Sequence, residues 1–304
     1  MILFLTVLKI ISPIFLLGSI GFIWEKIKVE YPIHFVTNLT MNISLPCLIF
    51  TSLMNSNVDH NILSSIIFST IITYILLILL CYVFVKSIKI DVPTFLPPMI
   101  FGNTGNLGLP LAFFAFGDLG LSYAIIIFAI MAIFSFTYGV WVISGETNFR
   151  KLFQEPIAWS AIIGAIFLFF NIKTPIFVTN SLELMGQIAI PLMLITLGVS
   201  VARLNLKNLT KGLTIISFRT IVCLFLSVSV SMLFSLTEVA SAILILQFTT
   251  PVAVTSYLLA ERFNRNPDDV ASLVIISTSM SILYIPLILK IHCYQKLFLM
   301  LLFV

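Results

Sequence analysis

Charged residues are scarce in this chain of 304 residues. Asp, Glu, Lys and Arg make up 9% of the sequence, whereas they make up about 25% of soluble domains. No hydrophilic stretch is long enough to form a separate soluble domain, and 60% of the residues are hydrophobic. A water-soluble fold of this length cannot cover so much apolar surface with polar groups. The composition therefore excludes a water-soluble fold and indicates a single membrane domain.

The chain also lacks the sequence patterns of several functional classes. Its basic residues form no patch or tail, so nucleic-acid binding is not expected. HExxH and GxSG motifs are absent, and Phe116-Gly117-Asp118 lacks both the first glycine and the partner aspartate of a GxGD-type protease. We therefore expect no enzyme, no cofactor and no resident metal, with H⁺ or Na⁺ as a coupling ion at most.

The cysteines and the N-terminus show no processing or cross-linking pattern. The four cysteines have no CxxC spacing and lie in or beside apolar segments, which favours packing roles over metal or disulfide roles. They are Cys47, Cys81, Cys223 and Cys293. The apolar start, Met1 to Leu8, has neither a preceding basic region nor a cleavage site of small residues. We therefore expect it to begin the first span.

Apolar blocks fill the sequence between clusters of charged and turn-forming residues. A membrane-spanning helix needs about 20 mostly apolar residues. Ten blocks approach or meet this length: Ile2–Ile23, Phe35–Met54, Ile62–Val85, Phe95–Phe116, Leu121–Ser144, Ile157–Ile172, Leu182–Val201, Leu213–Phe234, Val239–Ala260 and Val270–Leu289. The sequence predicts an all-α polytopic membrane protein with ten transmembrane helices.

Lysine and arginine divide unequally between the two sets of loops. Such residues are retained on the cytoplasmic side in short loops. The even-numbered loops hold only Lys173, and Lys290 and Lys296 lie on the wrong side for the rule. The odd-numbered loops hold eleven: Lys26, Lys28, Lys86, Lys89, Arg150, Lys151, Arg203, Lys207, Lys211, Arg262 and Arg265. This division predicts a multi-pass protein of the plasma membrane with both termini outside.

Two segments of the chain repeat the same pattern. Asn42–Thr51 in the second span and Gln187–Thr196 in the seventh match residue class by residue class, each with a proline at its fifth position. An odd number of spans separates them, so they cross the bilayer in opposite directions. We predict two inverted five-helix repeats, 1–146 and 147–304. Inverted repeats are typical of secondary transporters.

The fourth and ninth spans are interrupted at corresponding positions. The fourth contains Pro97-Pro98 and then Gly102–Pro110, and the ninth contains Gln247–Pro251, which are too many helix-breaking residues for continuous helices. Unwound backbone at membrane depth must be buried in protein or line an aqueous cavity, and half-helix N-termini there attract anions. The predicted substrate-binding residues of the two breaks are Asn103, Thr104, Gly105, Asn106, Pro110, Thr249, Thr250 and Pro251.

These features resemble the auxin efflux carrier family, which includes plant auxin exporters and bacterial carriers of organic acids. The resemblance covers nearly the whole chain. Besides the proline-bearing second span, it rests on Gly18–Phe22, Gly102–Leu111, Pro251, Ala260–Phe263 and the pair Asp268-Asp269. The stretch Asn103–Leu111 is its most specific part.

The resemblance implies more than the residues alone do. It implies that the broken fourth and ninth helices cross, with substrate held beside the crossing at Asn103, Asn106, Pro110 and Pro251. It also implies a scaffold of helices 1, 2, 6 and 7, often dimeric, and a moving transport part of helices 3–5 and 8–10. Plant members carry an ionisable pair in the third span, whereas Ile62–Val85 has none. The plant mechanism and substrate are therefore not expected.

Ionisable residues inside the predicted spans are few. Arg219 lies about seven residues into the eighth span, roughly 10 Å deep at 1.5 Å per residue. Two interpretations remain open for it, contact with a substrate or counter-ion and snorkelling or structural pairing. The carboxylates Asp118, Glu183 and Glu238 all fall near span ends. Hydroxyl groups of the third and tenth spans are interpreted as helix-packing groups.

The hypothesis that fits these observations is a secondary carrier for a small organic anion, such as a mono- or dicarboxylate, driven by a proton or sodium gradient. A channel or sensor that retains the carrier fold is the alternative, and an intramembrane enzyme is the least supported. The expected partners are the anion, the lipid bilayer and a second copy of the chain in a homodimer.

Overall fold

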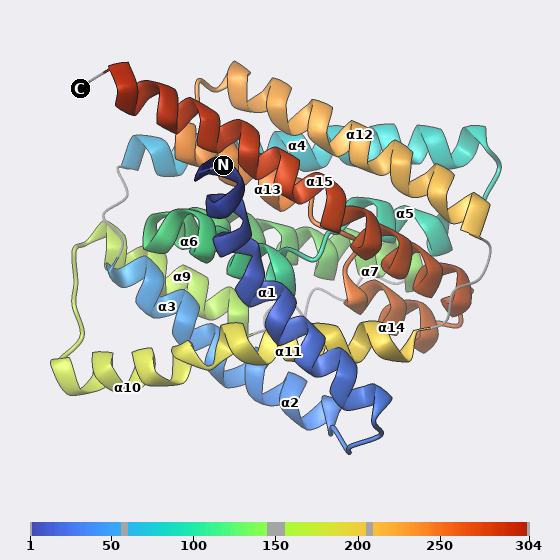
Figure 1. The fold of residues 1–304 in the computed structure, drawn as a ribbon, viewed down its shortest axis with the longest axis horizontal. Helices are drawn as coiled ribbons and strands as arrows, with labels where there is room; N and C mark the ends of the chain where they lie inside the picture. Colours follow the sequence, from blue (N-terminus) through green and yellow to red (C-terminus); the bar gives the residue numbers. More distant parts are fainter. Residues whose placement is uncertain (1, 56–59, 145–155, 205–208, 303–304) are drawn as a thin grey trace.

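The computed structural model describes residues 2–55, 60–144, 156–204 and 209–302, and helices dominate this part of the chain (Figure 1). Side chains are not described for residues 2–11, 60–61 and 291–302. Of the basic residues that predict the orientation, Arg150, Lys151 and Lys207 lie outside the described residues. The predicted repeat boundary at residue 146 lies outside them as well.

The first half of the chain forms helices that are interrupted by short π-helical turns. Their bounds are α1 Ile2–Lys26, α2 Ile33–Leu39, η1 Thr40–Ser44, α3 Leu45–Asn55, α4 His60–Ser87, α5 Val92–Ile100, η2 Thr104–Gly108, α6 Leu109–Phe134, η3 Ser135–Gly139 and α7 Val140–Ser144. Helix α6 is kinked at Gly117, whose φ of 64° only glycine adopts readily. The predicted fourth span ends at the residue before this kink.

The second half contains fewer interruptions. Its helices are α9 Pro156–Phe169, α10 Ile176–Gln187, α11 Ala189–Arg203, α12 Leu209–Leu233, α13 Glu238–Phe248, α14 Val254–Arg262 and α15 Pro267–Leu302. By length and composition, 6 helical runs of the described residues can cross a membrane, and α9 and α13 are apolar but shorter. The runs are Ile33–Asn55, Ile62–Ser87, Thr104–Ser144, Ile176–Arg203, Leu209–Leu233 and Pro267–Lys290.

The two repeated segments both depart from regular α-helix just before their prolines. The π-turn η1 ends two residues before Pro46, and α10 gives way to α11 at Ile188, three residues before Pro191. Proline lacks an N–H donor and its ring clashes with the preceding turn, so the helix must adjust there. The helices beside these irregular parts pack closely, because a Cβ on Gly186 of α10 would lie 3.0 Å from the Cα of Leu48 of α3.

One group of helices packs through small residues. Helix α1 lies along α11, and α3 packs on both α9 and α10. The closest approach is at Gly198, where a Cβ would lie 1.9 Å from the carbonyl oxygen of Gly18. A Cβ on Gly21 would lie 2.0 Å from the carbonyl oxygen of Ile195. Glycines therefore bring the backbones of α1 and α11 into direct contact, as small residues do in membrane helix pairs.

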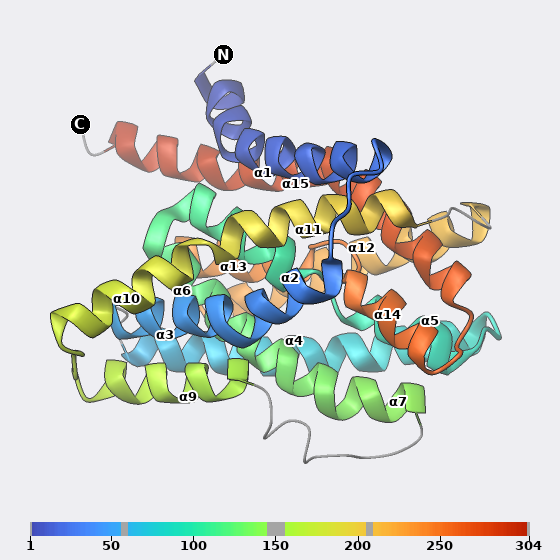
Figure 2. The same cartoon turned by 90° about the horizontal axis from the view of Figure 1, so that it is seen from below.

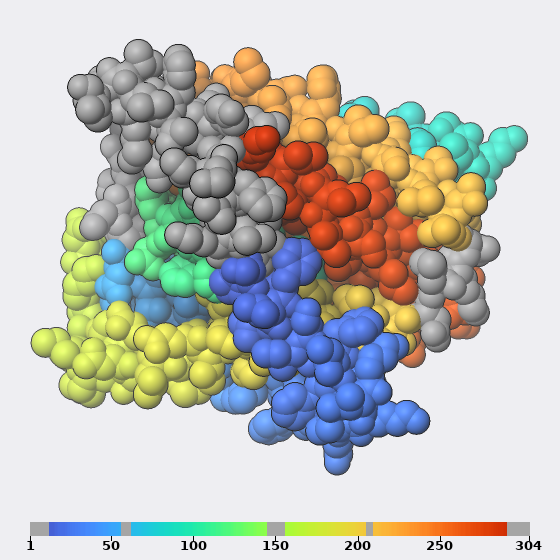
Figure 3. Space-filling model, in the orientation of Figure 1, coloured from blue at the N-terminus to red at the C-terminus, as the bar shows by residue number. Residues whose placement is uncertain are grey.

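A second group of helices surrounds the two breaks. Helix α12 contacts α4, α13 and α15, while α6 contacts α4 and α13. In the space-filling view, the described parts of α1, α11, α12 and α15 lie side by side on the visible face (Figure 3). Figure 2 shows α1 beside α15, which is where the two groups meet on this side.

The connections gather at two opposite ends of the molecule. Figure 1 shows the connections after α1, α4 and α14 in its right half, and those after α9 and α12 in its left half. Six basic residues lie in or beside the right-hand connections: Lys26, Lys28, Lys86, Lys89, Arg262 and Arg265. Lys173 lies between α9 and α10 at the other end.

Candidate functional site

The first break separates α5 from η2. Two prolines, Pro97 and Pro98, lie inside α5, and the helix ends at Ile100. Phe101 is extended, with φ −93° and ψ 109°, and Asn103 is the N-cap residue of η2. The predicted interruption of the fourth span is therefore confirmed.

The second break separates α13 from α14. Helix α13 ends at Phe248, Thr249 has φ −87° and ψ 0°, and Ala253 is extended before α14 begins at Val254. Pro251 lies in the middle of this segment. Its missing N–H costs no helical hydrogen bond there, because the segment is not helical. The predicted interruption of the ninth span is also confirmed.

Backbone hydrogen bonds join the two breaks. The amide of Asn103 donates to the carbonyl of Pro251 at 2.6 Å, and the amide of Ala253 donates to the carbonyl of Phe101 at 3.3 Å. Together these bonds form an isolated antiparallel bridge. Hydrocarbon could not form hydrogen bonds with the unwound backbone of either break. Each break instead supplies hydrogen-bond partners for the backbone of the other. We call the two bridged segments, residues 101–103 and 249–253, the crossover.

A glycine permits this close approach. A Cβ on Gly102 would lie 2.4 Å from the hydroxyl oxygen of Thr250 and 3.0 Å from Nη2 of Arg219. Real Cβ contacts do not reach the first of these distances. The side chains of α12 and of the second break therefore fill the space that any larger residue would need.

The C-terminal ends of α5 and α13 are capped by side chains from other helices. Arg219 of α12 donates from Nε to the carbonyl of Met99 at 3.1 Å and from Nη1 to the carbonyl of Thr250 at 2.9 Å. Tyr284 of α15 donates to the carbonyl of Thr249 at 2.8 Å. Arg219 is 0% exposed, so the snorkelling interpretation is wrong and structural pairing is what the geometry shows.

The N-terminal ends of η2 and α14 have no side-chain cap. The first N–H groups of a helix have no partner within the helix. At the start of η2, the amide nitrogen Nδ2 of Asn103 and the hydroxyl of Thr104 are buried without a partner among the described residues. Their side chains are 5% and 1% exposed, whereas Asn106 in the same turn is partly exposed. Unused side-chain donors therefore lie at the N-terminal end of η2, and Nη2 of Arg219 is a further unused donor near the crossover.

The other predicted site residues divide between this region and its surroundings. The hydroxyls of Thr249 and Thr250 donate to carbonyls one turn back in α13, so they do not offer free donors. Gly105 packs near the ring of Phe128, and Pro110 is buried in the first turn of α6. The structure brings Asn103, Thr250, Pro251 and Arg219 together at the crossover.

Three polar side chains near the crossover were not predicted as site residues. The hydroxyl of Ser277 accepts from the amide of Val252 at 2.9 Å, and Tyr284 caps α13. Gln247 is 0% exposed, and neither polar atom of its side chain has a partner among the described residues. It packs on Gly108, where a Cβ would lie 2.3 Å from its Oε1. The sequence feature that could have indicated a role for Gln247 is its position as a lone glutamine in an apolar helix.

A cavity of about 820 Å³ lies between α3, α6 and the α10–α11 junction. Its lining includes Asp118 and Glu183, and Glu183 accepts a hydrogen bond from Asn55 at 3.0 Å. The remaining lining residues that the structure describes are Leu48, Thr51, Ser52, Phe113, Phe114, Leu119, Leu121, Ser122, Gly186, Gln187, Ile190 and Pro191. The cavity is large enough for a small organic molecule.

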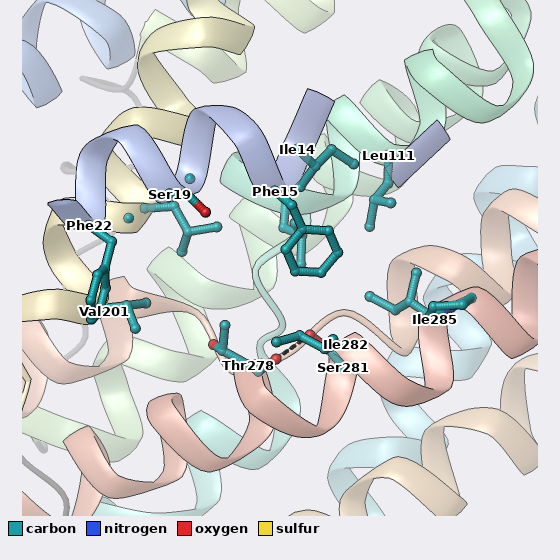
Figure 4. Close-up of a pocket in the computed structure, with 15 residues that line it drawn as sticks. Ile14, Phe15, Ser19, Phe22, Leu111, Val201, Thr278, Ser281, Ile282 and Ile285 are labelled. Atoms are coloured by element: carbon teal, nitrogen blue, oxygen red, sulfur yellow. Dashed lines mark hydrogen bonds between the residues drawn. The ribbon is translucent and has the colours of Figure 1, made fainter. Parts of the chain in front are cut away.

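A smaller cavity of about 220 Å³ lies between α1 and α15. Figure 4 shows Phe15 and Ile14 of α1 pointing toward Ile282 and Ile285 of α15. Leu107, from the turn that follows the first break, also lines it. Its lining is almost wholly apolar, so it does not suit a charged ligand.

Comparison with known proteins identifies the family. A family model described as a membrane transport protein matches residues 6–148 and 140–289 of the chain. The chain belongs to this family. The family is the auxin efflux carrier-like family that the sequence resembles. The chain is therefore a multi-pass helical membrane transport protein.

Two archaeal relatives are similar over nearly their whole lengths. An uncharacterized transporter of Methanocaldococcus jannaschii is 26% identical over 300 residues, which cover 92% of this chain and 96% of the relative. An uncharacterized transporter of Methanothermobacter thermautotrophicus is 24% identical over 293 residues, which cover 91% and 95%. This membrane transport protein thus spans the same length as its relatives.

Proposed function

We propose that this protein is a secondary active transporter that moves a small organic anion, a mono- or dicarboxylate, across the plasma membrane by alternating access. The observation that carries the proposal is the pair of uncapped N-terminal helix ends at the crossover. Each end carries about half a positive elementary charge and free N–H donors. The unpartnered groups of Asn103 and Thr104 lie at one of these ends. A carboxylate is the natural acceptor for such donors.

Helix packing supports a division into two parts. Helices α1, α3, α9, α10 and α11 contact one another, and the crossover is held by α4, α6, α12 and α15. We assign the first set, with α2, to the scaffold and the second, with α5, α7, α13 and α14, to the transport part. Ten spans arranged as two inverted repeats account for the mirrored breaks and for the repeated segments around Pro46 and Pro191.

The two ends of the molecule differ at equivalent positions of the repeat. Thr51, at the end of the first repeated segment, lines the 820 Å³ cavity. Thr196, its equivalent, makes a 2.8 Å hydrogen bond with the hydroxyl of Tyr31, from the connection after α1. One end of the pathway is therefore open as a cavity, and the other end is covered. Alternating access requires that only one end be open in any one state. With both termini outside, the hollow end faces outward.

Counterflow in liposomes tests this function. Purified protein, loaded with an unlabelled carboxylate, should accumulate the same labelled carboxylate transiently, and a sodium or pH gradient should drive net uptake. A channel gives no counterflow acceleration. If none of a broad panel of carboxylates is exchanged, the proposed function is wrong.

A matched pair of variants tests the site. Asn106→Ala removes the partly exposed amide of η2 and should abolish exchange while the protein still elutes as a single species. Asn38→Ala removes an exposed amide of α2, which lies 3.3 Å from Nδ1 of His34, and should leave exchange unchanged. If Asn106→Ala exchanges carboxylates at the normal rate, the substrate does not bind at the crossover.

A further inference from the structure

Within the part of the chain that the structure describes, Arg219 is a buried charge without an acidic partner. It lies near the middle of α12, Leu209–Leu233, and its side chain is 0% exposed. The ion pairs found among the described residues join Arg203 to Glu25 and Lys211 to Asp269, and neither involves Arg219. An isolated charge at this depth is costly, so something else must balance it.

The balance comes from two helix ends. The guanidinium binds the carbonyl of Met99, in the last turn of α5, and the carbonyl of Thr250, just after α13. Each helix C-terminus carries about half a negative elementary charge. The two ends together therefore supply about one negative charge, which matches the single positive charge of Arg219. The arginine and the two C-terminal ends form an electrically neutral unit.

The opposite helix ends are left unbalanced. The N-terminal ends of η2, which continues into α6, and of nine-residue α14 together carry about one positive charge. No carboxylate of the described residues caps them, and Asn103 and Thr104 keep buried polar atoms without a partner there. The crossover as a whole thus has room for one further negative charge.

The acidic lining of the cavity near α3 disfavours a cargo that carries a second negative charge. The ionisable groups that line it are Asp118 and Glu183, both acidic. Lys173, whose Nζ donates to the carbonyl of Met54 and to Oδ1 of Asn55, supplies one positive charge near the rim, so the two carboxylates remain in excess. A dianion entering here meets repulsion from two carboxylates and finds compensation for only one of its charges.

From this balance we infer that the cargo is a monoanion and that Arg219 is the positioning residue that sets this limit. The inference rests on the proposed function and deepens it, because the proposed function covers both mono- and dicarboxylates. Arg219 acts through its charge: Nε and Nη1 bind the two helix ends, and Nη2 is buried without a partner among the described residues. The recognised chemistry is a single carboxylate on an otherwise uncharged molecule.

Matched pairs of anions test the inference. Three dicarboxylates, the four-carbon succinate and malate and the five-carbon glutarate, are each compared with their monomethyl ester in counterflow at neutral pH. The esters should exchange at least tenfold faster than the parent dianions. Lowering the pH toward the second pKa of each diacid should raise its exchange, because the singly charged form accumulates. Equal or faster exchange of the dianions overturns the inference while leaving the carrier function intact, whereas exchange of no carboxylate overturns both.

Variants of Arg219 test the positioning role. Arg219→Gln leaves the negative helix ends uncompensated and should raise the KM of a monomethyl ester about tenfold. Arg219→Lys restores the charge and should return KM to within about threefold of the wild type. Arg262→Gln removes the charge of an exposed arginine outside the crossover, and should leave both KM and the ester preference unchanged.

A merely structural role for Arg219 predicts a different pattern. Folded Arg219→Gln with an unchanged KM, or Arg262→Gln with the same KM change, overturns the assignment. If Arg219→Gln does not fold, Arg219→Lys decides: loss of the ester preference in that variant overturns the inference, and its retention supports it.

Discussion

The amide of Asn103 and the carbonyl of Pro251 meet at 2.6 Å, which joins the first half of the chain to the second at the middle of their broken helices. In the second bond the amide of Ala253 donates to the carbonyl of Phe101, so each break donates one hydrogen bond and accepts one. The two bonds couple the broken helices at the crossover. Under the proposed function, we expect the crossover to move as one unit with the helices that cap it.

The closeness of the two breaks predicts that Gly102→Ala destabilises the protein. The new Cβ would meet the hydroxyl of Thr250 at 2.4 Å, and that hydroxyl is already fixed by a 2.7 Å hydrogen bond to the carbonyl of Gln247. We expect a loss of about 2 kcal/mol or more. The control is Gly105→Ala, whose Cβ would meet only the ring edge of Phe128 at 3.1 Å. Melting temperatures in detergent measure both, and equal values for the two variants would contradict the close packing.

The contact between α1 and α11 predicts opposite outcomes for two glycines of one interface. Gly198→Ala places a Cβ 1.9 Å from a backbone carbonyl oxygen that cannot rotate away. It should cost about 3 kcal/mol, at the upper end of overpacking changes. Gly18→Ala points into open space and should change stability little, because nothing lies within 4 Å of its Cβ. A melting temperature of Gly18→Ala that falls as far as that of Gly198→Ala would show a different helix contact.

The acidic lining of the cavity predicts that Asp118→Asn improves transport of anions. Asp118 is exposed and repels an incoming carboxylate, so its neutralisation should lower KM about twofold at low ionic strength. The difference should shrink as added salt screens the charge. Counterflow measured over a series of salt concentrations checks this. The exposed Glu30→Gln, outside the cavity, serves as the control, and a salt-independent effect of Asp118→Asn would argue against entry through the cavity.

The bond between Tyr31 and Thr196 predicts that the connection after α1 covers the pathway on the side away from the cavity. Ser200, one turn after Thr196, is 8% exposed, whereas its equivalent Asn55 is exposed and lines the cavity. In a Cys47→Ser background, Asn55→Cys should react with a membrane-impermeant thiol reagent from the cavity side. Ser200→Cys should react from the other side only after Tyr31→Ala. Fast reaction of Ser200→Cys with Tyr31 in place would show that this end is open.

This closure should not depend on pH in the physiological range. Burial raises the pKa of the Tyr31 phenol above its ordinary value, and this outweighs the hydrogen bond from Thr196 and the charge of Arg203, which both lower it. A raised pKa keeps the phenol neutral up to a pH above 10.0. Its contribution to stability is thus complete below that pH and is lost only as the pH rises through the folded-state pKa. The labelling rates of Ser200→Cys, corrected for thiol ionisation, should stay constant between mildly acidic and mildly alkaline pH.

The sequence predicts the breaks and their positions because proline and glycine act locally. Pro97, Pro98 and Pro251 forbid regular helix wherever the chain goes, so the interruptions follow without knowledge of tertiary contacts. The hydroxyls of the third span also follow from local chemistry. Ser69, Thr70 and Thr73 donate to carbonyls of α4 itself, as expected of packing groups in a membrane helix.

The role of Arg219 does not follow from the sequence. Its depth along α12 is readable, but its partners, Met99 and Thr250, belong to two other helices and are fixed only by the crossover. The same limit applies to Ser277, which was interpreted as a packing hydroxyl and in fact accepts a hydrogen bond from a break. Tyr31 lies outside the predicted spans, and nothing in the sequence indicates its hydrogen bond with Thr196. Groups that cap a distant backbone become visible only once the backbone is placed.

Ligand-induced stabilisation tests the central claim, that the cargo binds at the N-terminal ends of the crossover, without requiring a membrane or a gradient. Carboxylates, including the monomethyl esters, are added with and without sodium to purified wild-type protein, Asn106→Ala and Asn38→Ala, and the melting temperature is followed against concentration. The account predicts saturable stabilisation of the wild type and of Asn38→Ala, and none of Asn106→Ala. Equal stabilisation of all three proteins would contradict it.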